Sequence, residues 1–366
     1  MQAATLEGVQ RQLHRISAVS NEANTSQAEL QRYNEEMRGR NLLPYWEVIR
    51  QIGPSKPPQK SKPVSWNYQK DIRPYLVQAA NLISEEDAAR RVLVLNNPQL
   101  PLGCVTHTLC GALQIILPGE VANPHRHTQA AFRLILEGDG AHTIVEGERV
   151  KMHFGDLVLT PSWRWHSHGN ETDHTVIWFD GLDQPLVGYF GANFHENGTK
   201  ASMPNQPPDQ NLARYSSGIL PLAGIPTSLS SPVLSYPYER TRAALETLRM
   251  TEEWDPAHAL NMKHANPLNG DYVMPTMATF VQLIPKGFRS VPYRSTDSSV
   301  QVVLEGRGRT KIEDETFEWG PRDIVTVPNW CWTEMQADED SIVFSYSDRA
   351  ALERLGLWRE ERSRNS

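Results

Sequence analysis

The sequence predicts an all-β core built as two small barrels or jelly rolls, with a helical arm before them and a short helix after them. From about Val92 the chain consists of short apolar runs separated by glycine and proline, as in antiparallel strands joined by tight turns. A second region of this character begins near Tyr272 and repeats the first. A length of 366 residues suits one fold built twice.

Composition narrows the range of functions. A net charge of −7 without a basic stretch argues against binding to a nucleic-acid backbone. No apolar run approaches the roughly 20 residues that cross a bilayer, and the N-terminus lacks the pattern of a secretion signal. Cys104, Cys110 and Cys331 have no CxxC spacing, so reduced thiols are expected. We therefore expect a cytoplasmic protein.

Residues 1–91 are predicted to form the helical arm. Helices are expected at 6–16, at 26–37 and at 70–80. Another is expected after Ser84, which could cap a helix whose first turn contains the acidic residues 85–87. The proline- and lysine-rich segment 53–63 must be a loop. We expect the arm to be an oligomer contact or a covering layer rather than a separate enzyme.

The remaining boundaries follow from changes in residue pattern. Strands fill 92–183, the first barrel, and 271–347, the second. Between them, 184–270 is a linker rich in proline and asparagine with one clear helix, at 240–249. The end of the chain, 348–366, is expected to hold a short helix at 349–357 and a charged tail.

The repeat serves as an internal control. Leu136-Glu137-Gly138 matches Leu304-Glu305-Gly306, and 155–165 matches 322–332 after a one-residue insertion. Residues present in both copies, such as Asp156 and the paired tryptophans, are expected to serve the fold. Residues present in one copy are candidates for chemistry. Glu137 recurs as Glu305 and is therefore predicted to be a turn residue.

Three histidines of the first copy form a candidate metal site. His125 and His127 are two residues apart, so on a strand they point to the same face, and a paired strand can bring His166 beside them. The second copy has Tyr293, Ser295 and Thr333 at these positions, so it cannot hold the same ion. A lone His-x-His is more often two satisfied polar side chains. The histidines that have no partner at ligand spacing are expected to be surface or satisfied core residues.

The ligand set constrains the chemistry. The position four residues after His127, where related sites often carry a carboxylate, is Ala131. Three neutral imidazoles suit Fe, Zn, Cu or Ni and leave positions open for substrate. The uncompensated charge of the ion favours an anionic chelating substrate, such as a carboxylate with a neighbouring hydroxyl.

Four further residues are candidates for the site. Arg133 lies an even number of residues after His127, on the same face, and could capture a carboxylate; otherwise it is a surface arginine. His168 could bind substrate or transfer a proton, or could be a structural imidazole. Asp180 could orient a neighbour or belong to an ordinary turn. Gln114 recurs as Gln282, which favours a structural role, although it could still reach substrate.

Several motifs together resemble the bicupin ring-cleaving dioxygenases, which include gentisate, salicylate and 1-hydroxy-2-naphthoate dioxygenases. The resemblance covers about 42–360 and is closest to the gentisate branch. It rests on these segments: His125-Arg126-His127-Thr128-Gln129, Trp165-His166-Ser167-His168-Gly169-Asn170, Ala89-Arg90-Arg91-Val92-Leu93, Trp178-Phe179-Asp180-Gly181 and Gly356-Leu357-Trp358-Arg359-Glu360.

The resemblance implies two cupin barrels, a homotetramer, and Fe(II) held by His125, His127 and His166. It implies a substrate that chelates iron through its carboxylate and ortho hydroxyl, and dioxygen that opens the ring between the carbons bearing those groups, giving maleylpyruvate from gentisate. It places Arg91, Gln114, Arg133 and His168 around the substrate, with Asp180 in support.

Two departures concern the substrate. Relatives carry an aromatic residue near position 110 and glycine near 112, where this chain has Cys110 and Ala112. Because one methylene is worth about 1–3 kcal/mol in discrimination, salicylate, a 5-substituted salicylate or 1-hydroxy-2-naphthoate are alternatives to gentisate. Alternatives of other classes are a non-catalytic ligand-binding cupin and a Zn- or Mn-dependent isomerase or decarboxylase.

Overall fold

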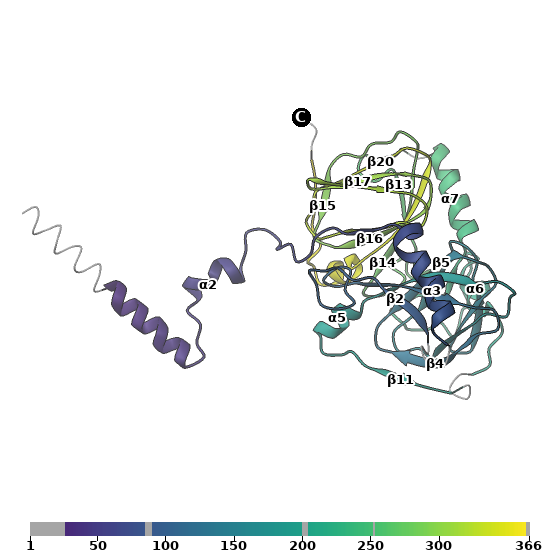
Figure 1. Ribbon diagram of the computed structural model, residues 1–366, viewed down its shortest axis with the longest axis horizontal. Helices are drawn as coiled ribbons and strands as arrows, with labels where there is room; N and C mark the ends of the chain where they lie inside the picture. Colours follow the sequence, from purple (N-terminus) through teal and green to yellow (C-terminus); the bar gives the residue numbers. More distant parts are fainter. Residues whose placement is uncertain (1–25, 85–89, 200–203, 252, 364–366) are drawn as a thin grey trace, which may run out of the picture. The chain divides into compact units, whose positions relative to one another are not determined.

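The computed structural model describes residues 26–84, 90–199, 204–251 and 253–363. The chain divides into two units, Met1–Pro58 and Gln59–Ser366. The first contains a helix over 26–39 and α2 (Tyr45–Ile52); the second contains the β-structure (Figure 1). The helices predicted at 6–16 and directly after Ser84 fall outside the described residues. Within the described ranges, no helix combines the length and apolarity needed to span a membrane.

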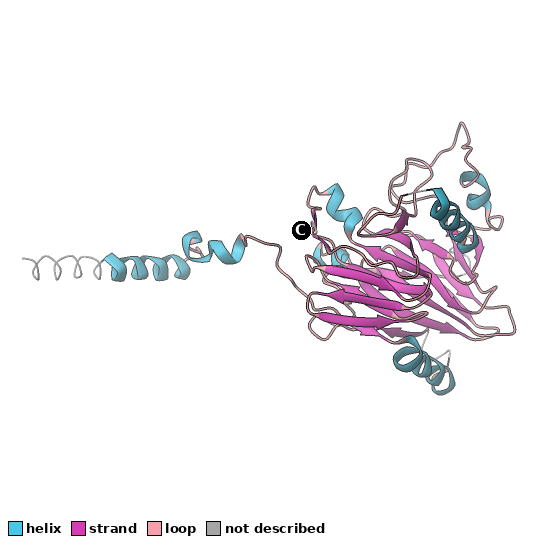
Figure 2. Cartoon of the chain, turned by 90° about the horizontal axis from the view of Figure 1, so that it is seen from above, coloured by secondary structure: helices cyan, strands magenta, loops and turns pink. Residues whose placement is uncertain are grey.

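Barrel 1 is formed by two sheets that share an apolar core. Figure 2 draws the strands of both barrels in magenta, stacked in layers. In order, the six-stranded sheet contains β12 (Ser235–Tyr236), β8 (Leu157–Thr160), β5 (Ala131–Glu137), β10 (Val176–Leu182), β3 (Cys110–Ile116) and β2 (Arg91–Val94). The five-stranded sheet contains β11 (His195–Asn197), β4 (Val121–His127), β9 (His166–Gly169), β6 (His142–Val145) and β7 (Glu148–Lys151).

Barrel 2 repeats this plan strand for strand. Its six-stranded sheet contains β1 (Ser65–Trp66), β19 (Ile324–Val327), β16 (Ser299–Glu305), β21 (Ser341–Ser347), β14 (Ala278–Ile284) and β13 (Leu260–Lys263). Its five-stranded sheet contains β18 (Glu315–Trp319), β17 (Gly308–Ile312), β20 (Thr333–Ala337), β15 (Tyr293–Ser295) and β22 (Glu360–Arg362). The predicted fold class, two cupin barrels with an all-β core, is confirmed.

The first strand of each copy belongs to the other barrel. β1 precedes barrel 1 in the chain but pairs with β19, and β12 precedes barrel 2 but pairs with β8. Soon after each of these strands, the backbone amide of a tyrosine donates a hydrogen bond to an aspartate. The Tyr68 amide donates to Asp323 and the Tyr238 amide to Asp156, both at 2.8 Å. These aspartates, predicted to serve the fold because both copies contain them, join the exchanged segments to the barrels.

The repeated Glu137 and Glu305 also act between the copies. Glu137 accepts a hydrogen bond from Arg73, at the start of α3 (Arg73–Leu82), with Nε 2.9 Å from Oε1. Glu305 accepts from Arg242 Nε at 3.2 Å and from the Tyr238 hydroxyl at 2.5 Å, both on α7 (Tyr238–Thr251). Each glutamate therefore anchors the helical segment that enters from the neighbouring copy, in addition to ending a strand.

The segment 184–270 contains more structure than the single predicted helix. α7 is present, but so are two six-residue helices, α5 (Gln184–Tyr189) and α6 (Gln210–Tyr215), and the edge strands β11, β12 and β13. Elements of two to six residues are too short to show a hydrophobic period, so the pattern could not reveal them. The strand β22, in the predicted charged tail, is also too short to show such a pattern. The last helix, α8 (Arg349–Arg354), ends earlier than predicted. The π-helix η1 (Tyr68–Ile72) precedes α3, where the sequence predicted one helix at 70–80.

The largest apolar core lies between the two six-stranded sheets. It combines residues of both barrels, including Phe132 and Phe179 of barrel 1 and Phe344 and Tyr346 of barrel 2. Alternation along each strand sends the intervening side chains into the barrel interiors. Gly181 is required at this packing, because a Cβ there would lie 2.2 Å from the Phe132 ring. The large aromatic residues therefore pack between the barrels, and the alternate residues of the same strands line the interior of each barrel.

Two buried aspartates fasten the barrels to each other. Asp183 accepts from the Ala130 amide of its own barrel, and from the hydroxyl of Thr276, which precedes β14. Asp348 accepts from the Ser298 amide at 2.8 Å and from the hydroxyl of Thr108, which precedes β3, at 2.6 Å. Burial raises the pKa of Asp183 to about 6 and that of Asp348 to about 7.

Candidate metal centre

A β-bulge in β4 sets the position of the first candidate ligand. Ala122 pairs with His168, but three residues later His125 pairs with His166, so β4 contains one extra residue. Pro124, which has no amide hydrogen to give to the ladder, lies in this interval, and bulges tolerate proline. The bulge places His125 directly opposite His166.

The three histidines converge on one point. Their ligand nitrogens lie within 4.8 Å of one another, and they are the one such group of His, Cys, Asp or Glu found in the described part of the chain. The ring centroids of His125 and His166 are 4.1 Å apart, and those of His127 and His166 are 4.8 Å apart. The structure thus brings together the trio that the sequence singled out.

Backbone carbonyls fix which nitrogen of each ring carries the proton. Nδ1 of His125, His127 and His166 lies 3.2, 2.8 and 2.9 Å from the carbonyl oxygens of Asn123, Gln129 and Arg164. A carbonyl only accepts, so each Nδ1 carries the proton and each Nε2 keeps its lone pair. Nε2 of His166 is buried without a hydrogen-bond partner, as expected of an atom that serves a metal.

The surroundings keep the imidazoles neutral. Burial lowers the pKa of His125 to about 3 and that of His127 to about 4, and it holds the pKa of His166 well below the ordinary value. The positive charge of Arg133 lowers the pKa of all three further. Neutral imidazole is the form that binds a metal ion, so the trio fits a divalent transition metal and adds no charge to it.

Arg133 and His168 form a buried pair beside the trio. Nη2 of Arg133 lies 2.8 Å from Nε2 of His168, and Nη1 donates to the Thr160 hydroxyl. Arginine only donates, so Nε2 of His168 accepts and Nδ1 carries the proton. Nδ1 in turn lies 3.0 Å from the Thr143 hydroxyl. Arg133 is 3% exposed and His168 is 0% exposed, which excludes the alternative of a surface arginine.

Asp180 compensates the buried guanidinium. Its Oδ1 lies 3.5 Å from Nε of Arg133, and its Oδ2 accepts from the Trp178 indole at 3.0 Å. Burial raises the pKa of Asp180, and Arg133 opposes that rise. The aspartate therefore faces the site rather than a surface turn, and it holds Arg133 in place.

Arg90, which the sequence reasoning did not single out, reaches the trio. Its Nη1 lies 2.9 Å from Nε2 of His125. The neighbouring Arg91, predicted to contact substrate, points elsewhere: its Nη1 bonds Glu120 at 2.5 Å and its Nε bonds the Ile83 carbonyl at 2.7 Å. Adjacent residues at a strand start project to opposite sides. The resemblance covered both arginines, but only the position of β2 distinguishes them.

Strand β3 supplies the remaining wall. Cys110, Ala112, Gln114 and Ile116 share one face by alternation, and Ile116 packs in the interior cluster of barrel 1. Gln114 is buried and pairs in register with Trp178, and Ala112 pairs with Asp180. All three candidate positions for substrate size and polarity thus lie on the interior face.

Comparisons with known proteins agree with this geometry. Residues 112–182 match the family described as Cupin domain. The chain is 44% identical to gentisate 1,2-dioxygenase 1 of Aquipseudomonas alcaligenes, over 92% of this chain and 97% of that protein. It is 33% identical to 5-aminosalicylate 1,2-dioxygenase of a Comamonas species, over 93% and 92%. The crystal structure of salicylate 1,2-dioxygenase from Pseudoaminobacter salicylatoxidans with gentisate has a TM-score of 0.84 at 29% identity, covering 92% of this chain and 94% of that one.

Proposed function

Because the chain belongs to the gentisate 1,2-dioxygenase family, we propose that it is an Fe(II)-dependent dioxygenase that opens the ring of an aromatic ortho-hydroxycarboxylate, with gentisate as the first choice of substrate. The observation that carries the proposal is the convergence of three neutral imidazoles whose Nδ1 atoms are all held by carbonyls. The identity with relatives that act on gentisate supports the choice of ring.

We assign the metal to His125, His127 and His166. Bound Fe(II) supplies the redox and Lewis-acid chemistry that lets dioxygen react with an aromatic ring. Since the ligands are neutral, the positive charge of the ion remains available to a chelating carboxylate and hydroxyl. The same ligand set suits other divalent metals, so the choice of iron rests on the family and on the reaction.

The arginines and His168 are assigned to the substrate. Arg133 carries a positive charge in a buried position, where a bidentate bond to a carboxylate is strong. Arg90 brings a second guanidinium to the trio, and we assign to it the role first given to Arg91. His168 offers a lone pair on Nε2, which can accept from the substrate hydroxyl when Arg133 turns to the carboxylate. Gln114 contributes an amide from β3.

The proposed reaction consumes one O2 for each ring. The bond between the carboxyl-bearing and hydroxyl-bearing carbons breaks, and each of these carbons receives one oxygen atom. The carboxyl-bearing carbon becomes the ketone of a 2-oxo acid, and the hydroxyl-bearing carbon becomes a carboxylate. No external reductant is needed, because the ring supplies all four electrons.

A second substrate class within the same chemistry has a specific basis. Cys110 and Ala112 face the barrel interior, and Ala112 pairs with Asp180, so both can change the space around the ring. Relatives named for 5-aminosalicylate and 1-hydroxy-2-naphthoate are both 33% identical to the chain. Substituted salicylates and hydroxynaphthoates are therefore the alternatives to gentisate.

We further propose a cytoplasmic homotetramer in which the N-terminal unit makes contacts between copies. The helix α2 leaves Tyr45, Trp46, Ile49 and Ile52 between 45% and 60% exposed. Large apolar side chains gathered on one short helix are typical of a contact surface. Light scattering of the full chain and of a chain beginning at Gln59 tests this, since the shorter chain should form smaller assemblies.

Oxygen uptake tests the activity. Protein purified anaerobically is loaded with Fe(II), Zn(II) or Mn(II) and given gentisate, salicylate, 5-aminosalicylate or 1-hydroxy-2-naphthoate. We expect one O2 consumed per ring opened, with Fe(II) only, and fastest with gentisate. Turnover without oxygen consumption indicates an isomerase or decarboxylase, and tight binding of the acids without turnover indicates a non-catalytic binding protein.

A further inference from the structure

Barrel 2 encloses a cavity of about 320 Å³ at the place where barrel 1 has its candidate metal centre. Positions that hold ligands in barrel 1 line it with other residues: Tyr293 and Thr333 correspond to His125 and His166, as the strand pairing shows. The volume is at the small end of ligand pockets and suits a molecule with about one ring. Within the described residues the cavity has no trio of His, Cys, Asp or Glu side chains at ligand spacing, so we consider it as a site for a small molecule.

The charges around the cavity are of both signs. Asp297 and Glu360 lie there with three arginines, of which Arg294 is turned to Glu361 and Arg362 to Asp255, at 2.8 Å. Burial lowers the pKa of His258, which keeps that imidazole neutral. Because each of the three guanidinium groups already has a carboxylate partner, a ligand with a negative charge alone gains little net attraction. An aromatic acid of the kind proposed for barrel 1 is therefore disfavoured in barrel 2.

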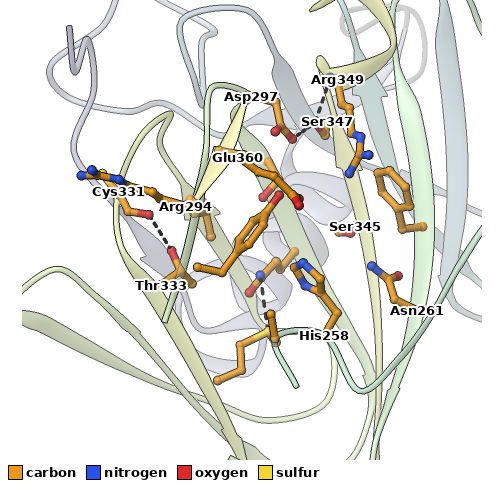
Figure 3. A pocket seen from close by; sticks show the side chains of 18 of the residues that line it. His258, Asn261, Arg294, Asp297, Cys331, Thr333, Ser345, Ser347, Arg349 and Glu360 are labelled. Carbon is orange, nitrogen blue, oxygen red and sulfur yellow. Dashed lines mark hydrogen bonds between the residues drawn. The ribbon is translucent and has the colours of Figure 1, made fainter. Parts of the chain in front are cut away.

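Arg349 and Glu360 approach the cavity from different elements without pairing. Arg349 begins α8, its Nε bonds Glu353 at 2.7 Å, and its guanidinium lies 3.8 Å from the centre of the Trp358 ring. Glu360 belongs to β22 and its nearest cation in the described chain is Arg362, at 3.6 Å. Figure 3 shows both side chains turned toward the same space, above His258 and Asn261.

The other charged wall residue is held in place by neutral groups. Asp297 accepts from the Trp358 indole at 2.8 Å and from the Ser347 hydroxyl at 2.5 Å, and no cation of the described residues lies within 4.0 Å of it. The Tyr293 ring stacks edge-on against His258, with centroids 4.4 Å apart, and forms an apolar wall. Apart from the two arginines that are turned to Glu361 and Asp255, the cavity thus offers the guanidinium of Arg349, two carboxylates and an aromatic face.

From this arrangement we propose that barrel 2 binds a small zwitterion of the amino-acid type. The carboxylate of the ligand bonds Arg349, its ammonium group bonds Glu360 and Asp297, and its side chain packs on Tyr293. A molecule with both charges satisfies both walls, whereas a molecule with one charge leaves the opposite wall unpaired and desolvated. This site is separate from the centre proposed for ring cleavage and does not depend on that function.

Calorimetric titration of the full-length, metal-loaded protein tests the proposal with L-phenylalanine as the probe. 3-Phenylpropanoate lacks the ammonium group, and 2-phenylethylamine lacks the carboxylate, so the three probes separate the two charges. We expect L-phenylalanine to bind at least about tenfold more tightly than either analogue. Equal binding of an analogue, or no binding by L-phenylalanine at millimolar concentration, overturns the proposal.

Variants assign any binding to barrel 2. Arg349→Met and Glu360→Gln should each weaken L-phenylalanine binding about tenfold. Arg354→Met is the matched control, because Arg354 lies on the same helix but bonds Asp271 outside the cavity, at 2.6 Å. Binding to the ion in barrel 1 would be equal in all three variants, and equal affinities would sink the proposal. Oxygen uptake is measured separately in each variant, so a failure of ring cleavage remains distinguishable from a failure of this site.

Discussion

Barrel 1 and barrel 2 place different side chains at the same interior positions. Arg133 pairs in register with Asp180 in barrel 1, and Gln301 pairs with Ser345 in barrel 2. On the outside the copies agree: Arg126 lies over Trp163 and Trp165 with Glu196 as its partner, and barrel 2 repeats the set with Arg294, Trp330, Trp332 and Glu361. The comparison teaches that outer contacts maintain the fold, while the interior is free to acquire or lack a function.

The largest difference between the barrels should disappear when a metal ligand of barrel 1 is removed. His127→Ala should lose bound iron, with at least about a hundredfold fall in metal affinity, and ring cleavage should disappear with it. The matched variant Ser295→Ala, at the equivalent position of barrel 2, should keep both. Iron analysis and oxygen uptake measure the outcome, and an active His127→Ala protein with a full iron content would refute the ligand assignment.

Replacing the Arg133–Asp180 pair of barrel 1 by the Gln–Ser pair of barrel 2 separates the effects on stability and on activity. Arg133→Gln copies barrel 2 and leaves Asp180 buried without its cation, which should cost on the order of 3 kcal/mol of unfolding free energy. It should also lower kcat/KM about a hundredfold or more while iron is retained. The double variant Arg133→Gln/Asp180→Ser reproduces the pair of barrel 2 and should regain stability without regaining activity.

Denaturant unfolding and steady-state kinetics on both variants decide this. Wild-type kinetics in Arg133→Gln would remove Arg133 from the site. A double variant as unstable as the single one would show that the lost charge balance is not the cause of the destabilisation.

A threonine shared by the two barrels has different partners in each. Thr143 bonds His168 in barrel 1, and its counterpart Thr310 accepts from the Trp319 indole at 3.0 Å in barrel 2. Thr143→Val leaves Nδ1–H of His168 unpaired and should lower kcat/KM about tenfold, whereas Thr143→Ser should restore it. Thr310→Val should lower stability and leave the kinetics unchanged; equal kinetics of the two valine variants would contradict the role given to Thr143.

The last expected effect concerns pH and the buried Asp348. An unfolded aspartate has a pKa near 3.9, whereas that of folded Asp348 is about 7, so between these values the folded state binds more protons. This contribution to stability is complete below about pH 4 and is lost as pH rises through 7. Asp348→Asn should remove it, flattening the dependence of the urea midpoint on pH between 5 and 8 relative to wild type. An unchanged pH slope in this variant would contradict the raised pKa.

The sequence was informative where a short-range rule and the repeat agreed. Two-residue alternation and the histidine-free second copy identify His125, His127 and His166, and an even spacing places Arg133 inside. Such short-range rules fail where a side chain's position depends on which strands pair and where a strand begins. Nothing local distinguishes Arg90 from Arg91 before the start of β2 is known, and no pattern in two residues reveals that β1 pairs with β19. The domain boundaries and substrate contacts therefore remain proposals.

The exchange of first strands has a consequence for how the protein is made. When the ribosome has completed the residues of barrel 1, the edge of β8 still awaits Ser235–Tyr236, and Ser65–Trp66 awaits a partner that begins only at Ile324. Barrel 1 is complete only after β12 has emerged, and barrel 2 only after β22, near the end of the polypeptide. A chain cut back to residues 92–183 would lack β12, the strand that covers the edge of β8, so the first barrel depends on residues far beyond its own sequence repeat.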